Sequence, residues 1–157
     1  MKLSAVNIQI GIVVSDFNKR IITNLLKGSL DSYIYYGGVK SDLKIYHVPG
    51  AFEIPATVKQ IINTNSVDAI VAIGSVIRGD TPHFDYIATE SARGLADVGR
   101  DAKIPVINGI LTTDNVKQAV NRSHPTELGL SHGNKGWDAM EAALHMVGVY
   151  KEIKSAS

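Results

Sequence analysis

The chain has 157 residues, of which 45% are hydrophobic and 20% are charged, and its 16 Lys and Arg residues nearly balance its 15 Asp and Glu residues. This composition argues against a disordered chain and a nucleic-acid-binding surface, and the absence of cysteine excludes disulfides, thiolate catalysis and Cys-ligated metals. No stretch reaches the roughly 20 apolar residues of a membrane span, and the first residues lack the apolar run of a signal peptide. We therefore expect a single cytoplasmic domain over residues 1–157, without a nucleic acid or a membrane as partner.

The first part of the chain predicts two strands, each followed by a helix. Residues 8–15 form a β-branched run, and the apolar residues that follow recur at helical spacing until Gly37 and Gly38 end the pattern. Residues 43–48 return to a period of two and predict the second strand. The next helix is expected over residues 52–62, with Pro55 in its first turn, where a missing backbone donor costs little.

The second part repeats this alternation. Residues 69–75 are the most apolar segment and predict the central strand, and an amphipathic helix is expected over residues 84–102. A fourth strand is expected at 105–111. Two further helices follow, one capped within residues 112–114 and ending near 120, the other capped by Asn134 and ending near 149, with an irregular stretch at 123–133 between them.

Four strands separated by helices predict an α/β fold with right-handed crossovers, in which a four-stranded parallel sheet lies between two helical layers in a flavodoxin-like, three-layer sandwich. Ligands of such sheets bind beyond the carboxyl ends of the strands. This rule places the candidate site at one rim, formed by residues 15–18, 48–53, 75–83 and 108–113.

The loop before the third helix has the residues of an anion-accepting helix start. Thr81 suits the N-cap and Pro82 suits the first helical position, and the free N–H groups of the first turn would face an anion such as phosphate. His83 in that turn is a candidate for proton transfer. The alternative is an ordinary surface histidine, with Arg78 and Asp80 paired to each other. The other histidines have no ligand-like spacing with carboxylates, so we predict no metal.

Five segments in order resemble the motifs of lumazine synthases, at residues 15–18, 49–55, 74–84, 109–113 and 133–136. The resemblance spans nearly the whole chain. It implies the condensation of 5-amino-6-(D-ribitylamino)uracil with 3,4-dihydroxy-2-butanone 4-phosphate to 6,7-dimethyl-8-ribityllumazine, with release of phosphate and water. It implies no cofactor, because imine formation, phosphate loss and ring closure call for a proton shuttle and an anion site.

The resemblance also implies a role for each matching residue. His83 corresponds to the proton donor, Phe17 to the aromatic ring that stacks on the pyrimidine, and Glu53 to the carboxylate that meets the ribityl hydroxyls. The other implied substrate-binding residues fall into three groups: the ribityl-binding neighbours Ala51 and Phe52, the pyrimidine edge-reading segment Ser75, Val76 and Ile77, and the phosphate-binding residues Asp80, Thr81, Arg122 and, as a weaker candidate, Lys135.

Two residues depart from the family pattern. Asn108 stands at a substrate-binding position where many members have Phe, so part of the apolar wall around the substrate would become polar. Asp138 stands where Glu is common, which shortens a carboxylate expected to contact His83 or Lys135.

Assembly is the last property that the resemblance implies. The stretch from Arg122 to Lys135 is longer than in members that form sixty-subunit shells and resembles that of members that stop at pentamers, so we predict a homopentamer. The resemblance places Asn108, Arg122 and Lys135 in the site of a neighbouring subunit.

Three alternatives stay open at this point. A riboflavin synthase of the same fold would lack the loop at 79–83 in this form. A lumazine- or flavin-binding carrier or shell protein would use the same scaffold without turnover. A flavodoxin-like electron carrier would need a Ser/Thr/Gly-rich phosphate loop after the first strand, which this sequence lacks.

Overall fold

Four parallel strands form the centre of the computed structural model, which describes residues 2–157. The strands are β1 (Ile10–Ser15), β2 (Leu43–Val48), β3 (Ala69–Ile77) and β4 (Val106–Thr113), in the spatial order β2-β1-β3-β4. Every residue of β1 and nearly all of β3 are buried, whereas the edge strand β2 is largely exposed. The continuous apolar runs of β1 and β3 are thus explained by their central position, with helices on both faces.

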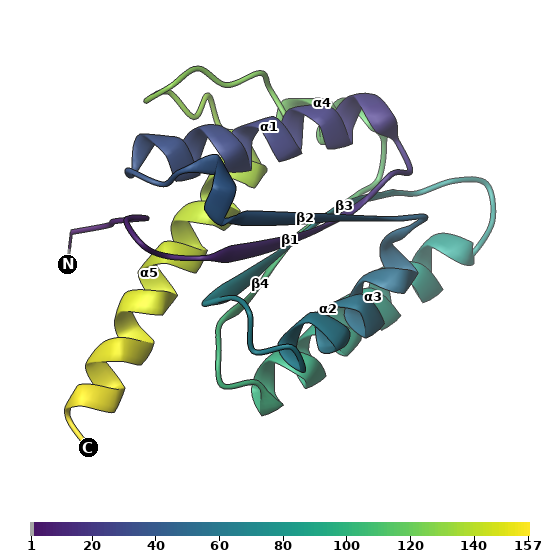
Figure 1. The fold of residues 1–157 in the computed structure, drawn as a ribbon. Coiled ribbons are helices and arrows are strands. Elements are labelled where there is room, and N and C mark those ends of the chain that lie inside the picture. The colour runs from purple at the N-terminus through teal and green to yellow at the C-terminus, as the bar shows by residue number, and fades with distance from the viewer. Residues whose placement is uncertain (1) are drawn as a thin grey trace.

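The helices cover the two faces of this sheet (Figure 1). On one face α1 (Lys19–Tyr35) packs against α5 (Lys135–Ser155), with the short α4 (Val116–Asn121) beside them. On the other face lie α2 (Ile54–Ile62) and α3 (His83–Asp101). Two single-turn 3-10 helices, η1 (Lys40–Asp42) and η2 (Ala51–Glu53), precede β2 and α2. The predicted three-layer α/β fold is confirmed, with one apolar core on each side of the sheet.

Several predicted boundaries were wrong by a few residues, and two of them matter for the site. β3 and β4 pair as far as Ile77 and Thr113, so both strands extend two residues beyond their predicted ends. The residues at 112–114 therefore cannot cap α4, and Asn115 does so, its side chain accepting a hydrogen bond from Gln118 N at 2.9 Å. Asn134 caps α5 as predicted, and that helix continues to Ser155, with residues 151–155 exposed.

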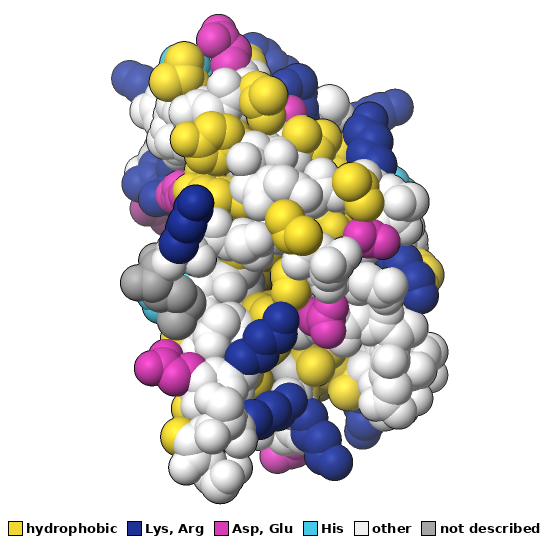
Figure 2. All heavy atoms as spheres, turned by 60° about the vertical axis from the view of Figure 1, so that its left-hand side comes forward, with side chains coloured by type: hydrophobic (Ala, Val, Ile, Leu, Met, Phe, Trp, Pro, Cys, Tyr) yellow, Lys and Arg dark blue, Asp and Glu magenta, His cyan; other side chains and the backbone are white. Residues whose placement is uncertain are grey.

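The surface that surrounds the amino ends of the strands carries both signs of charge. Figure 2, which turns the left-hand side of Figure 1 forward, shows basic, acidic and hydrophobic side chains interspersed on this face. Within residues 2–157, no helix is long and apolar enough to cross a membrane.

Tyr36, just after α1, joins this helix to α5 and makes part of the stability dependent on pH. Its hydroxyl donates a hydrogen bond to the Glu141 carboxylate, which together with partial burial raises the pKa of Tyr36 from 10.0 to about 12. The protonated tyrosine is thus favoured by folding, so its contribution is complete below pH 10 and disappears as the pH rises through about 12.

We therefore expect Tyr36→Phe to be less stable than the wild type at pH 8, with a difference that shrinks as the pH is raised from 10 towards 12. Urea unfolding at a series of pH values measures this difference. A gap that stays constant or widens over that range would show that the Tyr36–Glu141 bond does not set the pKa.

Candidate active site

A cavity of about 620 Å³ opens at the carboxyl ends of β1, β2 and β3 and the start of α3. This is the rim where parallel sheets bind ligands. Nine of the predicted site residues line it: Phe17, Ala51, Phe52, Glu53, Ser75, Val76, Ile77, Thr81 and His83. Segments far apart in the sequence therefore meet at one cavity because their strands end side by side.

Phe17 forms one wall of the cavity and is held by the residues around it. Its side chain is 68% exposed, which excludes the interpretation of Phe17 as a core residue. Asn18 adopts a left-handed backbone conformation with φ 64°, and its amide donates to Ser75 O at 3.1 Å. On the other side, Asp16 Oδ1 lies 2.7 Å from His47 Nδ1. These contacts fix the β1–α1 turn against β2 and β3, so the exposed ring is presented to the cavity by an ordered turn.

A second wall comes from η2, the turn between β2 and α2. Phe52 is 57% exposed, and Ala51 is buried beneath it. Glu53 N donates to Gly50 O at 3.3 Å, and a Cβ at Gly50 would lie 3.2 Å from Glu53 Oε2, so the carboxylate folds back over the turn. An apolar ring and a carboxylate thus face the cavity from the same turn, a combination suited to a ligand with an apolar part and hydroxyl groups.

The end of β3 supplies the floor. Ser75 and Val76 are buried and Ile77 is partly buried. The Ser75 hydroxyl and the neighbouring Ser15 hydroxyl are buried without a hydrogen-bond partner among residues 2–157. Because buried hydroxyls are normally paired, this floor has spare hydrogen-bonding capacity beside the cavity.

The loop at 78–83 leads into α3, which begins one residue earlier than the predicted range of 84–102 and has its N-cap one residue later than predicted. Pro82 occupies the N-cap and His83 is the first helical residue, while Thr81 Oγ1 accepts a long hydrogen bond of 3.4 Å from His83 N. The predicted positions of Thr81 as N-cap and Pro82 as first helical residue were therefore wrong. His83 is exposed and lines the cavity, whereas Asp80 is exposed in the same loop but outside the cavity lining. The positive end of α3 thus lies at the cavity, as an anion site requires.

Arg78 holds this loop in place, and it does not pair with Asp80 as the alternative interpretation proposed. Its guanidinium lies 3.1 Å from Asp114 and 3.4 Å from Asp85, and it stacks 4.4 Å from the centre of the Phe84 ring. The hydrogen bond to Asp114 is the main cause that raises the pKa of Arg78 above its already high usual value. Arg78 therefore ties the start of α3 to the end of β4.

Asn108 lies away from this cavity. It lies on the edge strand β4, pairs with Ala72 of β3 and borders a separate hollow of about 290 Å³ between α3 and α5, together with Leu95 and Tyr150. The prediction that residues 108–113 form part of the rim was wrong for Asn108, because β4 runs on to Thr113 before it reaches the rim.

Arg122 and Lys135 also lie outside the cavity of their own chain, but next to each other. Lys135 N donates to Arg122 O at 2.9 Å, and the Arg122 guanidinium donates to Gln118 O, also at 2.9 Å. Lys135 Nζ lies 3.2 Å from Asp138, so one of the two partners expected for this carboxylate is confirmed. Two exposed cationic residues are therefore joined through their backbones where the end of α4 meets the start of α5.

Sequence reasoning missed some residues that complete the cavity. Phe84 and Ile87 add apolar surface from α3, and Pro49, Gly50 and Gly79 line its edges. The helical spacing of Ile87 was a usable signal, since the inner face of α3 meets the sheet beside the cavity. Among residues 2–157, no group of three or more His, Asp or Glu side chains is placed to hold a metal ion.

Comparisons with known sequences identify the family of this chain. A sequence model of the family described as 6,7-dimethyl-8-ribityllumazine synthase matches residues 7–151. Three proteins that carry this name are similar over nearly the whole chain. The one from Chlorobium limicola is 43% identical over 96% of this chain and 94% of its own length. The one from Protochlamydia amoebophila is 45% identical, with coverage of 97% and 86%, and the one from Aquifex aeolicus is 39% identical, with coverage of 98% and 96%. The chain therefore belongs to the 6,7-dimethyl-8-ribityllumazine synthase family.

Proposed function

We propose that the cavity at the carboxyl ends of the strands is where this chain condenses 5-amino-6-(D-ribitylamino)uracil with 3,4-dihydroxy-2-butanone 4-phosphate. The family membership makes the chain a lumazine synthase, a transferase of riboflavin biosynthesis. The observation that carries the site is that an exposed aromatic ring, a carboxylate and a histidine at a helix start, Phe17, Glu53 and His83, line one cavity.

The proposed pose of the pyrimidine substrate follows from the walls of the cavity. Phe17 stacks on the heterocycle, and the backbone at residues 75–77 pairs with its polar edge. Glu53 accepts hydrogen bonds from the ribityl hydroxyls, beside Ala51 and Phe52. The apolar residues of the lining exclude water around the amine that reacts.

The proposed chemistry needs proton transfers more than a protein nucleophile. The amine of the pyrimidine attacks the ketone and water leaves, which gives an imine. Loss of a proton next to the imine then allows the C–O bond to inorganic phosphate to break, and ring closure releases a second water. His83 transfers protons in these steps, while backbone N–H groups at Asp80 and Thr81 bind the phosphate at the start of α3.

The remaining residues of the site are proposed to come from a neighbouring subunit of a homopentamer. Arg122 and Lys135 are exposed and joined through their backbones, they lie outside the cavity of their own chain, and the Arg122 guanidinium donates only to the backbone carbonyl of Gln118 among the contacts of residues 2–157. Asn108 would complete the wall around the heterocycle from the same neighbour. A native mass near five chains supports this arrangement, and a mass near sixty chains contradicts it.

One assay tests the function as a whole. Purified protein is mixed with both substrates, and the fluorescence of the lumazine product is followed against controls that omit one substrate. Steady turnover is the expected result. Binding of added lumazine without any turnover would instead indicate the non-catalytic carrier or shell protein.

A further inference from the structure

The cationic pair of Arg122 and Lys135 needs a structural explanation, because an irregular segment separates the two residues. Residues 123–133 contain neither helix nor strand, only an isolated bridge between Glu127 and Leu130. Its backbone turns through left-handed conformations at Gly129, His132 and Gly133. Such a segment does not by itself fix how its two ends are arranged. The backbone hydrogen bond from Lys135 N to Arg122 O joins the ends at one point, and a further contact holds the backbone on either side of that bond.

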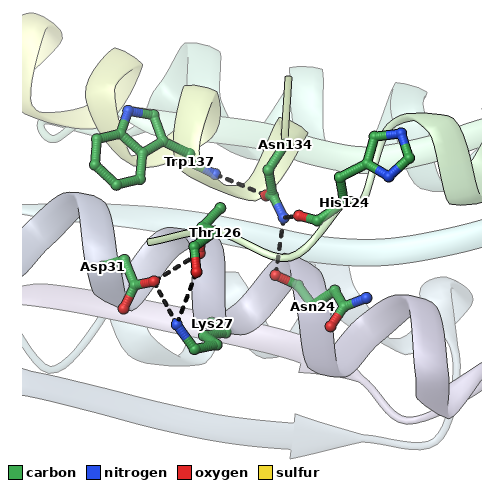
Figure 3. Close-up of polar contacts among 7 residues, drawn as sticks. All are labelled: Asn24, Lys27, Asp31, His124, Thr126, Asn134 and Trp137. Atoms are coloured by element: carbon green, nitrogen blue, oxygen red, sulfur yellow. Dashed lines mark hydrogen bonds and ion pairs between the residues drawn. The ribbon is translucent and has the colours of Figure 1, made fainter. Parts of the chain in front are cut away.

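The side chain of Asn134 makes that contact, as Figure 3 shows. Asn134 is 0% exposed. Its Oδ1 accepts hydrogen bonds from Gly136 N at 2.8 Å and Trp137 N at 3.1 Å. Its Nδ2 donates to Asn24 O at 3.0 Å and to His124 O at 2.8 Å. One buried amide therefore joins α1, the start of the irregular segment and the first turn of α5, with both its donors used.

The side chain of Asn134 is closely packed between α1 and α5. A Cβ at Gly28 of α1 would lie 2.2 Å from Asn134 Oδ1, and a Cβ at Gly136 would lie 1.9 Å from Leu25 O. The backbones of α1 and α5 thus approach closely only because both positions are glycine. The amide fills the space between them.

A second anchor holds the irregular segment at a different point. Thr126 Oγ1 lies 2.6 Å from Asp31 Oδ2, and Lys27 Nζ donates to Thr126 O at 3.2 Å and to Asp31 at 2.6 Å (Figure 3). This anchor fixes the middle of the segment to α1 and makes no bond to Arg122 or Lys135. It therefore offers a control for the effect of anchoring alone.

We propose that Asn134 is a positioning residue for phosphate binding: it holds the backbone on both sides of the Arg122–Lys135 hydrogen bond and so places the two cationic side chains, without touching the substrate. The inference rests on the proposed function of that pair. Lys135 follows Asn134 directly, and His124, which Asn134 binds, lies two residues after Arg122, so the amide fixes both ends of the segment. A phosphate held by two cations loses affinity when either is displaced by about 1 Å.

Asn134→Asp tests this with little change in shape. The carboxylate still accepts from Gly136 N and Trp137 N, but it has no donor for the carbonyls of Asn24 and His124. We expect the KM for the butanone phosphate to rise about tenfold or more, while kcat and the KM for the pyrimidine stay within about threefold. The Kd for inorganic phosphate, measured by calorimetry, should rise by a similar factor. Thr126→Val, which removes the hydroxyl bond of the second anchor to Asp31 and keeps the bond from Lys27 to the backbone, should leave all four values unchanged.

Gly28→Ala is the second variant, because it displaces the Asn134 amide and keeps every polar group. It should reproduce the selective rise in the KM for the butanone phosphate. A purely structural role would instead lower the thermal stability or disrupt the assembly of both variants. In the enzyme that stays folded, the KM values for the two substrates would then change by the same factor. Equal changes in both KM values, or none, overturn the inference.

The outcome for the wild type separates this inference from the proposed function. If the wild type makes no lumazine, the proposed function fails, and the Kd for inorganic phosphate then decides the inference. An equal Kd in the wild type and the two variants, or no phosphate binding at all, contradicts it. If the wild type turns over and only the selective effect is missing, the inference alone fails.

Discussion

His83→Asn is expected to lower kcat about 10²-fold, because the variant keeps a side chain of similar size but cannot transfer a proton. Substrate positioning and phosphate binding at the start of α3 should survive, so the remaining rate should still exceed that of the uncatalysed reaction. The measurement is the initial rate of lumazine formation at saturating concentrations of both substrates.

The matched control is His145→Asn, which changes an exposed histidine on α5 far along the helix from its first turn and should keep the wild-type rate. An unchanged kcat in His83→Asn would remove His83 from the proton transfers. Complete loss of turnover with intact substrate binding would show that His83 does more than move protons.

Arg122→Gln is expected to reduce kcat/KM for the butanone phosphate roughly 10²-fold, since the planar guanidinium can donate two charge-assisted hydrogen bonds to phosphate oxygens. The KM for the pyrimidine should change little. Arg122 is exposed and its hydrogen bond to Gln118 O lies at the end of a short helix, so the fold should tolerate the change.

Arg100→Gln is the control for the loss of one positive charge, because Arg100 is an exposed arginine that pairs with Asp97 near the end of α3. Steady-state kinetics with each substrate varied in turn distinguish the two changes. If Arg122→Gln raised the KM for the pyrimidine as much as that for the phosphate substrate, Arg122 would act on the site as a whole and not on the phosphate.

The sequence was sufficient to predict the helices and strands because the positions of their apolar residues follow the pattern of burial in each element. β1 and β3 are buried at nearly every position and mostly apolar, since helices cover both their faces, and α1 repeats buried residues such as Ile21, Ile22 and Leu25 at helical spacing. The ends of β3 and β4 were not predictable in this way. Each strand continues as far as its neighbour offers hydrogen bonds, which is a property of the pair and not of either segment.

The candidate site was predictable where it depends on strand order and not where it depends on packing between distant segments. Parallel strands bring residues 17, 51–53, 75–77 and 83 to one cavity, so the topology alone gathers them. The capping role of Asn134 could be read from its place before α5. Its bonds to Asn24 and His124 could not, because they require α1 and the irregular segment to meet.

We propose that each cavity is one half of a site, with His83 from one chain and Arg122 from its neighbour. The direct test mixes the impaired variants His83→Asn and Arg122→Gln, dissociates them together and lets them reassemble. If neighbouring chains share the site, random assembly creates intact sites that pair an unmodified His83 with an unmodified Arg122, and about a quarter of the wild-type activity should return. A mixture no more active than the average of the two separate variants would contradict the shared site.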